Sequence, residues 1–173
     1  ERLLNGWNSS RTTIDGLEIQ FLHVRSPEPD ALPLLLTHGW PGSVLEFREV
    51  IGPLSDPVAH GGQASDAFHL IIPSLPGFGF SAKPTARGWG VGRTAAAWVE
   101  LMRRLGYGER WAAQGGDWGS AITTALGFMQ PPGLRGLHLN MVMFEPSTQD
   151  IAEATPAEQK MLEDAQRYYA EFS

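Results

Sequence analysis

In Gln114-Gly115-Gly116-Asp117-Trp118-Gly119-Ser120, one acidic residue has a Gly two positions before it and another two positions after it. A short apolar run at residues 111–113 leads into this stretch, and a helix-like run at residues 120–129 leaves it. Asp117 is therefore expected at a tight strand-to-helix turn. Small flanking residues allow the backbone to take a sharp corner that exposes the central side chain.

Two interpretations of this turn stay open on the residues alone. The spacing has the form of the G-x-S-x-G nucleophile elbow, with Asp117 in the position of the serine. The N-terminal N–H groups of the following helix would then point at the carboxylate and help to keep it ionised. The alternative is an Asp that caps the helix after a Gly-rich turn, because small-x-Asp-x-small patterns also occur by chance.

The composition predicts a globular chain of about one domain, since 42% of the 173 residues are hydrophobic. The formal net charge of −6 argues against a general binder of nucleic acid or of anionic membranes. The chain has no Cys, which excludes a Cys nucleophile and thiolate zinc sites and is compatible with a cytoplasmic location. Its apolar runs are too short to span a membrane. No signal peptide is predicted. Because the chain begins with Glu1 rather than Met, we expect that the natural N-terminus is not included.

Apolar strands alternate with helices along the chain, which predicts an α/β fold with a largely parallel sheet. An Asp15-Gly16 pair predicts a hairpin between residues 12–14 and 17–25. Buried strands are expected at residues 32–37, 67–72, 109–114 and 134–140. Helices are expected at residues 44–54, 93–105, 120–129 and 155–169. Chemistry in such sheets lies at the carboxyl ends of strands, which here carry residues 38–43, residues 73–81 and Asp117.

The sequence favours neither a cofactor nor a metal. Gly77-x-Gly79-x-x-Ala82 follows a strand and resembles a dinucleotide fingerprint, but Pro84 follows it instead of the helix that the fingerprint requires. No pair of His residues has the spacing of metal ligands on a helix. A serine hydrolase is also disfavoured, because the chain contains no G-x-S-x-G.

Three loop motifs occur in order at the ends of the expected strands: His38-Gly39-Trp40-Pro41-Gly42-Ser43, Pro76-Gly77-Phe78-Gly79-Phe80-Ser81 and Gly115-Gly116-Asp117-Trp118-Gly119. They resemble the oxyanion loop, the loop after the next strand and the nucleophile elbow of epoxide hydrolases with an α/β-hydrolase fold, especially the microsomal and juvenile-hormone type. The resemblance covers nearly the whole chain. It implies the tail of an N-terminal segment at residues 1–16, the first half of the hydrolase core at 17–150 and the start of a helical lid at 151–173.

The resemblance also implies a mechanism in which an epoxide becomes a vicinal diol. A carboxylate can open the strained ether and form an ester that water later cleaves, and the resemblance assigns this role to Asp117. Ester cleavage passes through an oxyanion that needs preorganised donors, and the backbone N–H groups of Trp40 and Trp118 are the candidates. A pocket for a small hydrophobic epoxide is expected to be lined by His38, Pro41, Phe78, Trp118 and Met143.

Some parts that the resemblance implies are not found in this sequence. The family needs a His base with an acidic partner late in the chain, and lid tyrosines that protonate the epoxide oxygen. The only His after Asp117 is His138, which is expected in mid-strand, where a His is usually buried and hydrogen-bonded. His38 is expected mainly to fix its own loop by hydrogen bonding. We therefore expect that these 173 residues alone do not turn over.

Two other functions stay open at this point. Haloalkane and haloacid dehalogenases share the fold and also use an Asp at the elbow, and halide release without diol formation would identify one. A non-catalytic binding module that keeps the fold would also lack the base. An epoxide hydrolase would serve detoxification or secondary metabolism, and the sequence leaves both the substrate and the formation of a homo-oligomer undetermined.

Overall fold

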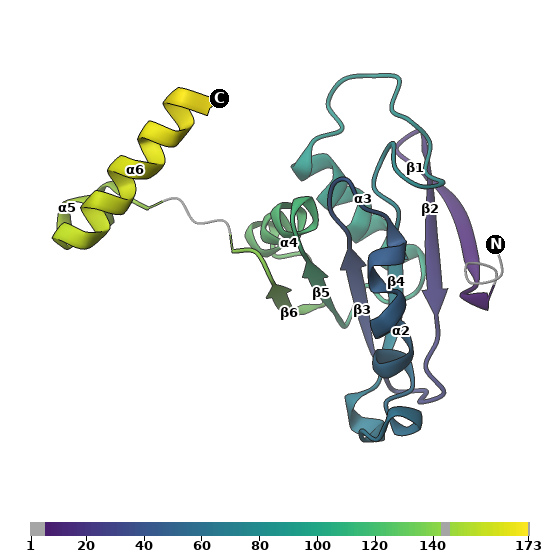
Figure 1. The fold of residues 1–173 in the computed structure, drawn as a ribbon. Coiled ribbons are helices and arrows are strands. Elements are labelled where there is room, and N and C mark those ends of the chain that lie inside the picture. The colour runs from purple at the N-terminus through teal and green to yellow at the C-terminus, as the bar shows by residue number, and fades with distance from the viewer. Residues whose placement is uncertain (1–5, 143–145, 173) are drawn as a thin grey trace. The chain divides into compact units, whose positions relative to one another are not determined.

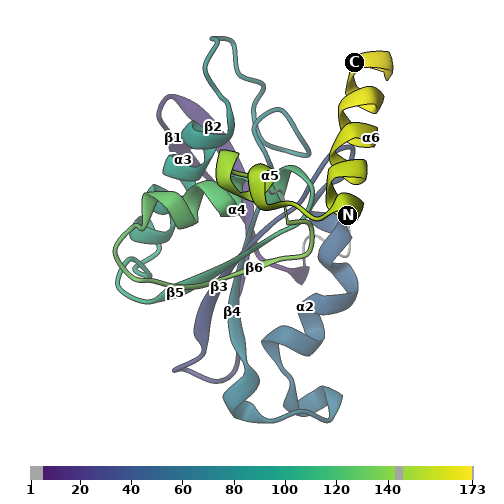
Figure 2. The same ribbon diagram turned by 90° about the vertical axis from the view of Figure 1, so that its left-hand side faces the viewer.

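The computed structural model describes residues 6–142 and 146–172, which form two compact units that divide after Val142. The first unit holds a six-stranded sheet with helices on both faces, and the second holds two helices (Figures 1 and 2). The expected α/β fold is therefore confirmed. The domain boundaries expected after residues 16 and 150 stay a prediction.

The sheet has the spatial strand order β1-β2-β4-β3-β5-β6. Its strands are β1 (Ser9–Ile14), β2 (Leu17–Val24), β3 (Leu32–Thr37), β4 (Phe68–Pro73), β5 (Trp111–Gly115) and β6 (Leu134–Leu139). The four strands β4, β3, β5 and β6 pair in parallel. β2 pairs antiparallel with both β1 and β4. β1 and β2 form the hairpin that Asp15-Gly16 predicts, and both turn residues have positive φ.

Alternating side chains of the central strands divide the core between the two faces of the sheet. Leu35 and Ile71 face the larger cluster, which includes residues of α3 (Val91–Arg104) and α4 (Trp118–Met129). Leu34 and Leu36 face the smaller cluster with α2 (Arg48–Ser55). Because both faces are buried, β3 and β4 read as continuous apolar runs.

The α-helices agree with the sequence pattern except at two places. The helix expected at residues 44–54 begins as a 3-10 turn, η1 (Val44–Phe47), before α2. In the second unit, α6 (Pro156–Phe172) follows Thr155, whose hydroxyl and backbone N–H both hydrogen-bond to Glu158, as the capping-box pattern predicts. A short helix that the sequence did not predict, α5 (Thr148–Glu153), is capped by Ser147. Among the described helices, none is both long and apolar enough to cross a lipid bilayer.

The sheet has an open edge at β6. No strand in the described part of the chain pairs with the outer side of β6, and residues 135–138 are exposed. An apolar cavity of about 770 Å³ lies between α2 and the neighbouring sheet surface, with Leu34, Leu36, Phe47 and Val50 in its wall. The opposite surface of the sheet is covered by α3 and α4. A helix, α4, therefore packs on only one face of β6 (Figure 2).

Candidate active site

Asp117 lies at a sharp corner between β5 and α4. Its φ of 52° and ψ of −125° are disfavoured for a residue with a side chain. The flanking glycines allow the corner to pack closely, because a Cβ on Gly115 would collide with the carbonyl of Gly119, and a Cβ on Gly119 would collide with the carbonyl of Thr37. The spacing of small residues around Asp117 thus meets a steric requirement on both sides of the corner.

The Asp117 carboxylate does not cap α4. No capping hydrogen bond forms from its side chain, and Oδ1 instead accepts a hydrogen bond of 2.7 Å from the backbone N–H of Trp40. This bond is the largest cause of a pKa of Asp117 below its ordinary value, and the backbone N–H of Trp118, the first residue of α4, shifts the pKa in the same direction. The geometry therefore favours the elbow interpretation over the capping one: an exposed, ionised carboxylate with two backbone donors.

The loop that carries Trp40 is anchored by His38, whose ring is buried. Its Nε2 accepts a hydrogen bond of 3.1 Å from the backbone N–H of Leu75, so the ring proton lies on Nδ1, which donates to the carbonyl of Gly39 at 2.9 Å. Burial lowers the pKa of His38. Its contacts match the expected role of fixing the loop, and the Trp40–Pro41 peptide that follows is cis.

The loop after β4 is fixed by a buried polar network. Ser74 donates its hydroxyl to Oε1 of Gln20 at 2.6 Å, and Ser81 donates its hydroxyl to the carbonyl of Ser74 at 2.8 Å. The Ser81 hydroxyl also accepts the backbone N–H of Gln20 at 3.0 Å. These bonds attach residues 74–81 to β2 and so hold Phe78 in place beside the elbow loop.

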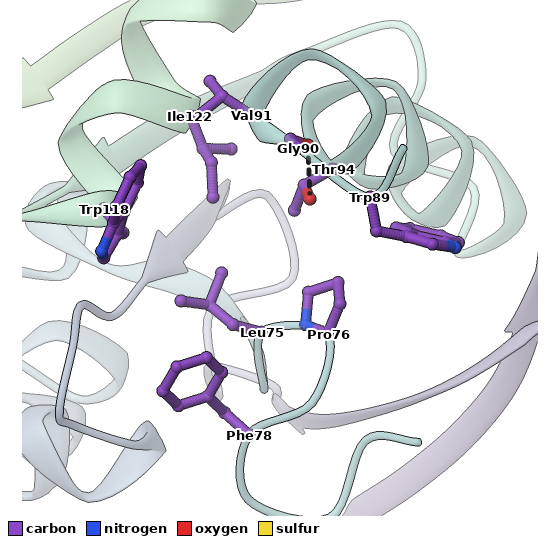
Figure 3. A pocket seen from close by; sticks show the side chains of 9 residues that line it. All are labelled: Leu75, Pro76, Phe78, Trp89, Gly90, Val91, Thr94, Trp118 and Ile122. Atoms are coloured by element: carbon purple, nitrogen blue, oxygen red, sulfur yellow. Dashed lines mark hydrogen bonds between the residues drawn. The ribbon is translucent and has the colours of Figure 1, made fainter. Parts of the chain in front are cut away.

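An apolar cavity of about 250 Å³ lies beside the elbow (Figure 3). Phe78 and Trp118, two of the expected pocket residues, line it, whereas His38 and Pro41 are not among its lining residues and Met143 lies outside the described residues. The sequence interpretation missed the remaining wall, formed by Leu75, Pro76, Trp89, Gly90, Val91, Thr94 and Ile122. The sequence did offer a signal for Trp89, because a Trp between two glycines just before a helix is typical of a loop that lines a pocket.

Two further expectations concern His and metals. His138 is exposed in β6 rather than buried, because β6 is the edge strand and part of its surface is uncovered. Within the described ranges, no group of three or more His, Cys, Asp and Glu residues is placed to hold a metal ion.

Comparisons with known proteins bear on this arrangement of a strained Asp, two backbone donors and an apolar cavity. Residues 33–173 match the family model of the alpha/beta hydrolase fold. The chain belongs to the alpha/beta hydrolase fold family. Residues 1–47 also match a model described as the epoxide hydrolase N terminus.

Relatives narrow the position of the chain within the α/β hydrolases. A protein of Stigmatella aurantiaca is 56% identical over 97% of this chain and 38% of its own length. Epoxide hydrolase 1 of Oryctolagus cuniculus is 41% identical over 82% of this chain and 32% of its own length. The crystal structure of juvenile hormone epoxide hydrolase from Bombyx mori superposes with a TM-score of 0.70 and 37% identity, covering 81% of this chain and 37% of that chain.

These comparisons confirm the resemblance to epoxide hydrolases of the microsomal and juvenile-hormone type. The α/β hydrolase described here spans about a third of the length of the curated relatives that it matches.

Proposed function

We propose that this chain supplies the nucleophile and the oxyanion donors of an epoxide hydrolase, which converts an epoxide into a vicinal diol through an ester on Asp117. The observation that carries the proposal is the 2.7 Å hydrogen bond from the backbone N–H of Trp40 to Oδ1 of Asp117. It occupies one carboxylate oxygen before any substrate binds. Oδ2 is left as the oxygen that attacks.

In the first step, Oδ2 attacks one ring carbon and the bond from that carbon to the epoxide oxygen breaks. The electron pair of that bond passes to the epoxide oxygen, which takes up a proton and becomes a hydroxyl. The product is an alkyl ester in which Oδ1 of Asp117 is the carbonyl oxygen. The attacking carboxyl is ionised at neutral pH, because its pKa lies below the ordinary value of 3.8.

In the second step, water attacks Cγ of Asp117 and negative charge collects on Oδ1. Trp40 already donates to this atom, and we propose that the N–H of Trp118 supplies the second donor, so the donors need little reorganisation. One such donor typically lowers the barrier by about 2.7–4 kcal/mol. We propose that the base which activates this water, and the acid of the first step, lie outside these 173 residues.

The proposed substrate is a small epoxide that carries a hydrophobic group. The cavity beside the elbow is walled by Leu75, Phe78, Trp118 and Ile122, which offer an apolar surface with few polar atoms. A haloalkane could form the same ester, but the match of residues 1–47 to the epoxide hydrolase N terminus favours the epoxide. Homo-oligomer formation and the cytoplasmic location stay predictions.

Mass spectrometry of the chain after incubation with styrene oxide tests the proposal. We expect one covalent adduct on Asp117, formed slowly because water replaces the proposed acid as the proton donor, and no repeated formation of diol, because the proposed water-activating base lies outside these residues. Asp117→Asn should abolish the adduct, whereas Asp30→Asn, at another exposed Asp that does not line the cavity, should leave the adduct on Asp117. An adduct on a different residue contradicts the nucleophile assignment. Bromide release from a bromoalkane, with no adduct from the epoxide, would favour a dehalogenase.

A further inference from the structure

Trp89 lines the cavity at a distance from the elbow. Figure 3 shows Trp118 and Trp89 at opposite sides of the cavity, with Leu75 and Pro76 between them. Trp89 lies in the loop before α3, between Gly88, which has a φ of +104°, and Gly90. Neighbours with so much backbone freedom do not fix an indole ring by themselves, so its orientation depends on side-chain contacts.

Arg93 provides such a contact one helical turn later. Its guanidinium carbon lies 4.6 Å from the centroid of the Trp89 ring, within the range of a cation–π interaction. Its Nε donates a hydrogen bond of 2.6 Å to Oδ2 of Asp15. Asp15 belongs to the β1–β2 turn, whose backbone is set by the hairpin. A chain of contacts therefore runs from the N-terminal hairpin to the cavity wall.

The position of Arg93 gives Asp15 a second effect. Arg93 lies in the first turn of α3, which holds no acidic residue of its own, and a cation at a helix N-terminus is disfavoured by the helix dipole. The carboxylate of Asp15 offsets that penalty and orients the guanidinium. Arg103, near the other end of the same helix, pairs with Glu100 and lines none of the cavity.

We propose that Trp89 is a specificity-determining residue that closes the apolar end of the cavity around the substituent of the substrate, and that Arg93 and Asp15 are positioning residues that hold its ring. The substituent is of phenyl size, because an apolar cavity of about 150 Å³ already holds benzene and this cavity measures about 250 Å³. That the substrate reacts through an epoxide rests on the proposed function. The inference that the cavity binds a phenyl group is independent of it.

Binding of benzyl alcohol, which carries a phenyl group and no epoxide, tests the wall directly by NMR titration of the chain. We expect Asp15→Asn and Arg93→Ala to raise the dissociation constant about two- to five-fold, the effect of an exposed cation–π or ion-pair contact. Arg93→Lys should fall between the parent and Arg93→Ala, since Lys keeps the charge but not the planar stacking. Arg103→Ala should bind like the parent.

A structural readout accompanies the titration. The Arg93 side-chain protons should be shifted upfield by the Trp89 ring current in the parent, and Asp15→Asn should reduce that shift. Asn tolerates the positive φ of Asp15, so this exposed variant keeps the hairpin folded. Equal dissociation constants for the parent, Asp15→Asn and Arg93→Ala would overturn the inference.

Turnover separates this inference from the proposed function. In the polypeptide extended to the length of the relatives, Asp15→Asn should raise KM for styrene oxide about two- to five-fold with kcat retained, and should leave both constants for propylene oxide unchanged. If no epoxide is hydrolysed but benzyl alcohol binding depends on Asp15 and Arg93, the proposed function is wrong and the inference about Trp89 is supported. If styrene oxide is hydrolysed with a KM that is the same in the Asp15 and Arg93 variants, the inference about Trp89 is wrong and the proposed function is supported.

Discussion

The backbone N–H of Trp40 donates a 2.7 Å hydrogen bond to Oδ1 of Asp117, which lies 77 positions later in the chain. The parallel register of β3 and β5, in which Thr37 is opposite Gly115, brings the two loops to the same edge of the sheet. The missing side chain of Gly39 allows the approach, because a Cβ there would collide with the Asp117 side chain. The contact between Trp40 and Asp117 thus depends on strand register as well as on the two loop sequences.

Backbone strain at Asp117 should lower the free energy of unfolding, and a pair of substitutions can measure it. A residue in such a sparsely populated conformation costs about 1–3 kcal/mol, whereas Gly adopts it freely. We expect Asp117→Gly to be more stable than Asp117→Ala by about 1–3 kcal/mol in urea unfolding, since both variants lose the carboxylate and only Ala keeps the strain. Equal unfolding free energies for the two variants would show that the corner is relaxed.

The glycines around the elbow should not accept even a methyl group. In Gly119→Ala the new Cβ would meet the carbonyl of Thr37, which is backbone and cannot rotate away, so we expect a loss of about 3 kcal/mol or more. Gly92→Ala is the matched control, because its site is exposed and open and lies in α3. Ala should stabilise that helix by about 0.5–1 kcal/mol. Urea unfolding of both variants checks the contrast.

Asp117 should stay ionised in acid. Since the Trp40 and Trp118 N–H groups lower its pKa, the midpoint of its ionisation should lie below pH 3.8, the ordinary value. The same shift means that the ionised carboxylate adds stability above pH 3.8, which is lost as the pH falls through the lowered pKa. Carboxyl-carbon NMR of Asp117 measures the midpoint, and a value at or above 3.8 would contradict the hydrogen bonds described.

His38 should make the fold sensitive to mild acid. Its pKa is lowered from 6.5 by burial, so the folded chain holds the ring neutral while the unfolded chain takes up a proton. Stability from this residue is therefore complete above pH 6.5 and declines as the pH falls below it. His23 has a lowered pKa as well, again chiefly from burial. Urea unfolding of the parent and of His38→Gln on both sides of pH 6.5 measures the contribution of His38. The unfolding free energy should depend less on pH in His38→Gln, and an equal pH dependence would contradict the prediction.

The sequence predicted the sheet well where burial determines the pattern. β3 occupies the expected residues 32–37, because a strand buried on both faces leaves a continuous apolar run. The order of the strands could not be predicted, since β4 lies between β2 and β3 through contacts that no local pattern encodes. α5 was missed because its six residues are too few to show a helical period.

The candidate site was predicted unevenly for a similar reason. Asp117 and Trp40 lie in loops with distinctive residues, so the motifs predict both as site residues, and the structure brings them into contact. Trp89 and Arg93 lie in a stretch whose sequence predicts a loop followed by a helix and no site residue. Their link to Asp15 spans 78 positions of sequence, and no periodicity or motif reports such a contact.

The open edge of β6 has a practical consequence for work with this polypeptide. Its outward N–H and C=O groups lack strand partners in the described part of the chain, and an apolar cavity of about 770 Å³ lies on the adjacent sheet surface. Unpaired edges of this kind recruit strands from other molecules. Concentrated samples should therefore self-associate through β6, and a charged substitution at Gly136, where a Cβ meets nothing within 4 Å, should keep them dispersed.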